Sequence, residues 1–146
     1  MYKHILIATD GSELSGHAVD QGLALAKALG SQVTLFTAVA PFHVYAIEPY
    51  PQGDQREEYR RRALARAEGF LKPARDKAET LGLACDSVAI EHAYPHQAIM
   101  DAARERGCDL IAMASHGRRG VSAMLLGSET LKVLTHSNIP VLVFRR

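Results

Sequence analysis

Cysteine is scarce in this sequence, which contains only Cys85 and Cys108 among 146 residues. These two are too few and too widely separated to form a disulfide framework or a CxxC metal-binding knuckle. Both lie beside apolar segments that are typical of strands. We therefore expect two buried free thiols, the usual state of cysteine in a reducing compartment.

An excess of charge is also lacking. The chain has 17 Lys and Arg residues against 16 Asp and Glu residues, a formal net charge of +1 at pH 7 with neutral histidines. This balance gives no general attraction to nucleic acid or to an anionic membrane. No apolar run reaches transmembrane length, and the run at the N-terminus is too short for a signal peptide. We expect a soluble cytoplasmic protein with no nucleic-acid or membrane partner.

Two common nucleotide-binding motifs are missing as well. The P-loop signature GxxxxGK[ST] occurs nowhere in the sequence, so the chain is not a P-loop protein. The turn after the first apolar segment lacks GxGxxG, which excludes the dinucleotide-binding fingerprint there. A nucleotide site in this chain must therefore use a different phosphate cradle.

Apolar, β-branched segments alternate with segments of helical periodicity along the whole chain. Strands are predicted at His4–Thr9, Gln32–Ala40, Cys85–His92, Asp109–Ser115 and Asn138–Phe144. Helices are predicted from Ser12 to Gly30, around Tyr59–Leu81, at Pro95–Gly107 and at Ser128–His136. The alternation predicts one doubly wound, Rossmann-like α/β domain over residues 1–146, with a single five-stranded parallel sheet and helices on both faces.

Local signals refine this outline. Ser12 is a good N-cap, and Gly30 suits the C′ position that closes the first helix. Pro73 should kink or split the second helix, because proline has no amide hydrogen and clashes with the preceding turn. The proline-rich segment Pro41–Asp54 predicts a long loop. The strand Cys85–His92 is weaker and more polar than the others, so we expect it near a sheet edge.

The stretch Ala114–Ser128, ASHGRRGVSAMLLGS, has the composition of a phosphate cradle. It ends with Gly127 and Ser128 at the start of a predicted helix, where unpaired amides and a partial positive charge attract phosphate. Gly117 would let the backbone approach a ligand closely, and Arg118 would add positive charge. A glycine-rich connection without a ligand explains these residues equally well.

Asp10 ends the first predicted strand. Ligands of doubly wound sheets bind beyond the carboxyl ends of the strands, and the loops after the first and fourth strands both lie at that edge. A carboxylate at this place could bind a ribose or a Mg²⁺ ion. The alternative, which the sequence DGSE favours locally, is an Asx turn or a helix cap.

A first strand that ends in ATDGSE, together with the C-terminal segment MASHGRRGVSAMLLGSETLKVLTHSNIPVLVFRR, resembles the universal stress protein family. The resemblance covers the whole chain. The nucleotide-binding branch of that family carries G-x2-G-x9-G-[S/T], which Gly117, Gly127 and Ser128 match. The first glycine of the motif is replaced by Ala114. If the backbone at that position had positive φ, or lay against a phosphate, the methyl group would cost about 1 kcal/mol.

The resemblance implies an adenine nucleotide alpha hydrolase-like fold and a site for ATP with Mg²⁺. Asp10 would bind the ribose hydroxyls, and the backbone of Val39 would meet the edge of the adenine. The other residues implied at the nucleotide are Thr9, Met113, Ala114, Gly117, Gly127 and Ser128. A phosphate contact by Arg118 is inferred from its charge and position, and the alternative is that it points to solvent.

The resemblance further implies a nucleotide-dependent regulator in the stress response. It also implies a homodimer that pairs through the apolar edge strand Pro140–Phe144. We do not expect an efficient enzyme, because no Walker lysine and no water-activating carboxylate are evident. Ala114 leaves open a protein-interaction module that does not bind nucleotide. His116 with Arg118 leaves open a slow ATPase, and autophosphorylation on Ser122 or Ser128 is a further alternative. The sequence also leaves open whether Pro41–Asp54 folds over the nucleotide as a lid.

Three histidines and a charged segment have simpler explanations than a functional site. His92 and His96 lack a third ligand at metal-binding spacing, and His116 is expected on the surface at the mouth of the cleft. The remaining signal is a set of charge pairs at helical spacing: Glu57 with Arg61, and Glu58 with Arg62. These pairs predict a solvated helix face rather than a nucleic-acid site.

Overall fold

The computed structural model describes residues 1–42, 53–117 and 126–145. The strands are β1 (His4–Ala8), β2 (Gln32–Val39), β3 (Cys85–Glu91), β4 (Leu110–Ala114) and β5 (Val141–Phe144). They form one five-stranded sheet in the order β3-β2-β1-β4-β5, and every neighbouring pair is parallel. The helices are α1 (Glu13–Leu29), α2 (Gly53–Thr80), α3 (Pro95–Glu105) and α4 (Ser128–His136). The predicted fold class is confirmed.

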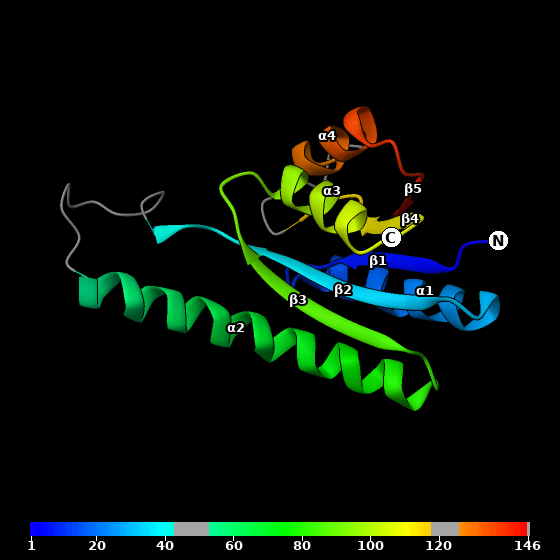
Figure 1. Ribbon diagram of the computed structural model, residues 1–146, viewed down its shortest axis with the longest axis horizontal. Helices are drawn as coiled ribbons and strands as arrows, with labels where there is room; N and C mark the ends of the chain where they lie inside the picture. Colours follow the sequence, from blue (N-terminus) through cyan, green and yellow to red (C-terminus); the bar gives the residue numbers. More distant parts are fainter. Residues whose placement is uncertain (43–52, 118–125, 146) are drawn as a thin grey trace.

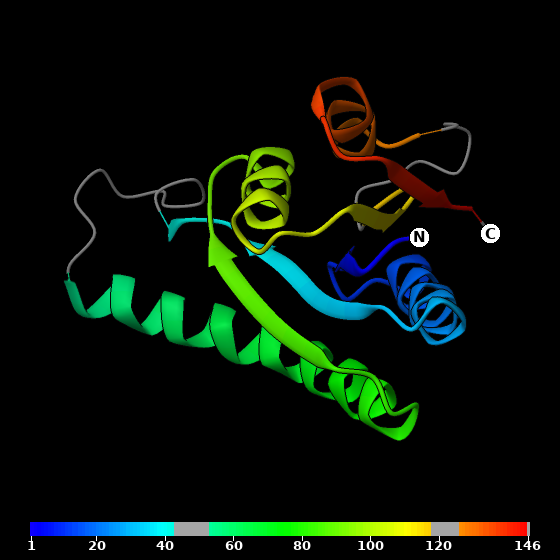
Figure 2. The ribbon, with the colours of Figure 1, turned by 45° about the vertical axis from the view of Figure 1, so that its right-hand side comes forward.

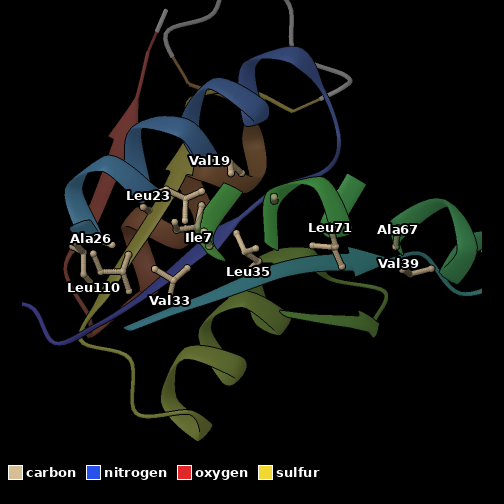
Figure 3. Packing of buried hydrophobic residues seen from close by; sticks show 14 of the residues in the cluster. Ile7, Val19, Leu23, Ala26, Val33, Leu35, Val39, Ala67, Leu71 and Leu110 are labelled. Carbon is tan, nitrogen blue, oxygen red and sulfur yellow. The ribbon is translucent and has the colours of Figure 1, made fainter. Parts of the chain in front are cut away.

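Helices α1 and α2 cover one face of the sheet, and α3 and α4 cover the other (Figures 1 and 2). The first face buries Ile7, Val19, Leu23, Leu35, Leu71 and Leu110, which Figure 3 shows packed between the sheet and the two helices. The second face buries Leu6, Phe36, Ile99, Ala102, Ile111, Met113 and Val133. Because both faces are covered, the three central strands need apolar side chains on both sides, and this explains their near-continuous apolar runs.

The ends of α1 are capped as the sequence predicts. The hydroxyl of Ser12 accepts a hydrogen bond from the amide of Ser15 at 3.3 Å, and Gly30 has the left-handed φ of 69° that a C′ glycine supplies. Within the helix, Gly22 faces β1 so closely that a Cβ there would lie 2.8 Å from Cδ1 of Ile7. The absence of a side chain at Gly22 therefore sets how near α1 lies to the sheet.

Helix α2 continues through Pro73, so the predicted split is wrong. Proline removes the hydrogen bond to the carbonyl of Gly69, but both residues are exposed and water can take the place of the missing donor. On the opposite face, Ala67, Leu71 and Ala74 are buried against the sheet. The packing of that face holds the helix together across the break in its hydrogen bonds.

Strands β3 and β5 form the two edges of the sheet, as predicted. Cys108 is buried, whereas Cys85, on the edge strand β3, is only partly buried and corrects our expectation. Both thiols are free, and burial raises the pKa of each to about 11. The last strand starts at Val141 rather than at Asn138, because Ser137 and Ile139 bond to each other in a tight turn.

The charged face of α2 differs from the predicted pairing in one respect. Glu58 binds Arg62 as expected, but it also binds Arg61, which the sequence pattern had assigned to Glu57. These groups are largely exposed, so the pairs contribute little to stability. Of the predicted loop Pro41–Asp54, residues 43–52 lie outside the described ranges. No helix in the described ranges is long and apolar enough to cross a membrane.

Candidate functional site

The strand order reverses at the centre of the sheet, where β1 lies between β2 and β4. In an open parallel sheet, the loops on the two sides of such a reversal leave in opposite directions and open a crevice at the carboxyl ends of the strands. Thr9 and Asp10 follow β1, and Ser115 to Gly117 follow β4. These residues therefore lie where doubly wound sheets bind their ligands.

Asp10 and Gly117 bring these two loops into direct contact. A Cβ atom on Gly117 would lie 2.6 Å from Oδ2 of Asp10, closer than any side chain can approach. Only glycine fits at position 117 without movement of the carboxylate. The close approach explains the glycine by geometry and puts a carboxylate at the edge of the proposed phosphate cradle.

The other oxygen of Asp10 holds the turn after β1. Oδ1 accepts the amide of Ser12 at 3.0 Å, which is the Asx turn weighed as the local alternative. Thr9 is buried, and its hydroxyl lies 2.9 Å from that of Ser15 and accepts the amide of Gly11 at 3.2 Å. Ser15, which the sequence analysis missed, is the buried hub of this turn. The hydroxyl of Thr9 therefore already has hydrogen-bond partners within the protein.

The start of α4 is tied to the end of β4 by two hydrogen bonds. The amide of Gly127 donates to the carbonyl of Ser115 at 2.7 Å, and the hydroxyl of Thr130 donates to the carbonyl of Ala114 at 2.9 Å. Gly127 is the N-cap of α4, and no side chain caps the helix. The amide of Gly127 is therefore already in use, whereas the first turn that begins at the exposed Ser128 has no capping side chain.

Ala114, the one departure from the family motif, is the last residue of β4 and is 7% exposed. No residue other than glycine has positive φ in the described ranges, so this alanine carries no backbone strain. Met113 precedes it and packs on the α3–α4 face with Ala8 and Phe36. The strain that the sequence analysis considered for Ala114 is absent.

Val39 ends β2 and is buried, and its carbonyl accepts the amide of His92 at 2.9 Å. This bond continues the pairing of β2 with β3 beyond the last residue of β3. Val39 therefore lies at the carboxyl edge of the sheet, and this bond fixes its position relative to the residue that follows β3. Arg118, the expected phosphate contact, lies outside the described residues.

His116 is more enclosed than we expected. Its Nδ1 lies 3.0 Å from the hydroxyl of Ser115, and its Nε2 is buried with no hydrogen-bond partner. Nε2 is the only buried side-chain nitrogen or oxygen without a partner in the described part of the chain. A buried polar atom without a partner is costly, and such atoms often mark places where a ligand completes the bonding.

His96 binds a carboxylate. Its backbone amide and its Nδ1 both lie 2.9 Å from Oε2 of Glu129. Although burial by itself would raise it, the hydrogen bonds from His96 hold the pKa of Glu129 below its usual range. No group of three His, Cys, Asp or Glu residues suited to a metal is present in the described ranges.

Comparisons with known proteins bear on the family and the fold of the chain. A model of the Universal stress protein family matches residues 1–145. The chain is 32% identical over 145 residues to the "Universal stress protein in QAH/OAS sulfhydrylase 3'region" of Thermus aquaticus, covering 99% of this chain and 100% of that one. The solved structure of MJ0577 from Methanocaldococcus jannaschii superposes with a TM-score of 0.86 at 28% identity, covering 100% of this chain and 97% of that one. A universal stress protein in complex with cAMP gives a TM-score of 0.71 at 25% identity, covering 98% and 97%.

Proposed function

Because the chain belongs to the universal stress protein family, we propose that it binds an adenine nucleotide, ATP with Mg²⁺, in the crevice beyond β1 and β4. The similar protein solved in complex with cAMP supports an adenine nucleotide as the class of ligand. The central support is the contact between Gly117 and Oδ2 of Asp10, where a Cβ would come within 2.6 Å. This contact joins a carboxylate to a glycine-lined cradle at the reversal of strand order.

The residues fit such a ligand in kind and in place. Asp10 accepts hydrogen bonds from the ribose hydroxyls, and its second oxygen stays in the Asx turn that orients the carboxylate. The uncapped first turn of α4 presents amides and the hydroxyl of Ser128 to the phosphates. The unpartnered Nε2 of His116 faces a polar group when the ligand is bound. Gly117 and Gly127 keep side chains out of the cradle.

The remaining assignments complete the proposal. The backbone of Val39 meets the adenine edge, Met113 packs near the base, and Arg118 contacts the phosphates. The protein acts as a cytoplasmic, nucleotide-dependent regulator of the stress response without efficient catalysis. It is a homodimer that pairs through β5, an edge strand whose Leu142 is 36% exposed.

Calorimetric titration of ATP with Mg²⁺ tests the proposal. Asp10→Asn keeps an oxygen for the Asx turn and removes the charge, so we expect affinity to fall about tenfold or more with little change in stability. Asp20→Asn, an exposed aspartate on α1, is the matched control and should bind as the wild type does. Wild-type protein that takes up no ATP would contradict the proposal and favour a protein-interaction module.

A further inference from the structure

The start of α3 lies over the carboxyl ends of the central strands. Ala98 and Ile99, in the first turns of α3, are buried with Ala8 at the end of β1 and with Met113 near the end of β4. Pro95 occupies the first turn of the helix, so the residue before it, Tyr94, leads directly into this packed end. The turn between β3 and α3 therefore lies at the carboxyl ends of the strands, where the proposed site is.

One hydrogen bond joins this turn to the end of β2, and a second holds the turn itself. The amide of His92 donates to the carbonyl of Val39 at 2.9 Å, and the amide of Tyr94 donates to Nδ1 of His92 at 2.8 Å. Tyr94 is thus two hydrogen bonds away from the residue whose backbone meets the adenine in the proposed function.

The ring of Tyr94 is exposed and yet held in place. The residue is 63% exposed, and its phenol makes no hydrogen bond within the described part of the chain. The ring of His92 lies 6.1 Å away, centroid to centroid, at 63°, and the ring of His96 lies 6.2 Å away at 58°. The ring of His96 is itself fixed by Glu129. A flat aromatic ring that its neighbours orient, and that stays largely exposed, suits a planar ligand.

We propose that Tyr94 stacks on the nucleotide base. This inference rests on the proposed function, because it needs a base bound near Val39. Stacking uses the π face that every base has, so Tyr94 contributes affinity for the base without reading its identity. The backbone at Val39 then discriminates among bases, whereas Tyr94 favours the binding of nucleotides over that of free polyphosphate.

The absence of tryptophan from the sequence provides a direct test. Tyr94→Trp introduces a single fluorescent reporter at this position, and stacking on adenine should quench its emission. Leu29→Trp is the matched control. Leu29 is also exposed, at 39%, but it ends α1 at the amino ends of the strands, away from the proposed site. We expect ATP and AMP to quench the Tyr94→Trp variant by about half or more and tripolyphosphate to leave its emission unchanged. The emission of the Leu29→Trp variant should respond to none of the three.

Affinities of two further variants complete the test. Tyr94→Ala should weaken ATP binding about tenfold and leave tripolyphosphate binding unchanged, whereas Tyr94→Phe should restore the affinity. Equal thermal stability of these variants excludes a merely structural role. One outcome is that the wild type binds ATP in calorimetry, while ATP neither quenches the Tyr94→Trp variant nor binds Tyr94→Ala more weakly. In that case the inference about Tyr94 is wrong and the proposed function stands. If the wild type binds no ATP, the proposed function fails and takes this inference with it.

Discussion

His96 and Glu129 join the first turns of α3 and α4 through a single carboxylate oxygen. The backbone amide and the ring nitrogen Nδ1 of His96 both lie 2.9 Å from Oε2 of Glu129. Helix α3 has no capping side chain of its own, so Glu129 supplies the anion that its N-terminus lacks. The same carboxylate belongs to the first turn of α4, where the proposed phosphate cradle begins. The two helix starts on this side of the crevice are therefore held as one unit.

The first prediction concerns the pH dependence of this link. Burial alone would raise the pKa of Glu129, but the hydrogen bonds from His96 lower it from its ordinary value of 4.5. The ionised carboxylate therefore stabilises the fold above the unfolded pKa, and this stabilisation disappears as the pH falls through the lower folded pKa. Glu129→Gln should lose about 0.5–1 kcal/mol at pH 7, after allowance for solvent screening, and less at about pH 3.

Urea denaturation of wild type and variant at both pH values measures this difference. Glu79→Gln, an exposed residue near the end of α2, is the control and should show no loss at either pH. A loss of the same size under acidic and neutral conditions would mean that the charge of Glu129 is not what stabilises the link.

The second prediction concerns Thr130, which is 3% exposed and donates to the carbonyl of Ala114 at 2.9 Å. Thr130→Val keeps the shape of the side chain and removes the donor, so unfolding should become easier by about 1–3 kcal/mol. Thr130→Ser keeps the hydroxyl and should lose less. Denaturant unfolding of the three proteins gives the comparison. A serine variant that is less stable than the valine variant would contradict the role of the hydrogen bond.

The sequence predicted the framework well because apolar periodicity reports burial directly. The strand predicted at His4–Thr9 and the helix predicted at Pro95–Gly107 both follow from packing on the sheet, and both are confirmed. The predicted split at Pro73 is wrong, because packing against the sheet holds α2 together where proline removes a hydrogen bond. The outcome there depended on tertiary contacts that no local rule contains.

The site was predictable only in part, for a related reason. The order of the strands and the family resemblance placed Gly117 and Asp10 at the same edge of the sheet, and the structure brings them close together. The hub at Ser15 and the link between His96 and Glu129 join residues whose partners follow from how the elements pack. Neither has a spacing in the sequence that would identify it. Family resemblance carried the nucleotide assignments, which remain proposals.

The third prediction compares two glycines of α1. A Cβ on Gly22 would lie 2.8 Å from the buried Ile7, whereas a Cβ on Gly16 would meet nothing within 4 Å. Gly16→Ala should raise the free energy of unfolding by about 0.5–1 kcal/mol through helix propensity alone. Gly22→Ala has the same gain but must displace the Ile7 side chain in a packed core, so it should be less stable than Gly16→Ala by about 1 kcal/mol or more. Equal stability of the two variants would show that Ile7 can move freely.

The last prediction concerns Ala114, where the family motif has glycine. The residue ends β4 with ordinary φ, and its methyl group is buried. Ala114→Gly restores the motif, yet it relieves no backbone strain. It removes buried contacts and adds the conformational freedom of glycine, so we expect a loss of about 1 kcal/mol in stability.

Affinity for ATP is the decisive measurement on this variant. If the alanine is tolerated because its backbone is unstrained, Ala114→Gly should bind ATP within about twofold of the wild type, since no strain is released. A gain of about tenfold or more would instead show that the methyl group obstructs the phosphates, because backbone strain is already excluded as a cause. The two results thus separate a methyl group that the cradle tolerates from one that crowds it, and only crowding would make the motif glycine necessary for tight binding.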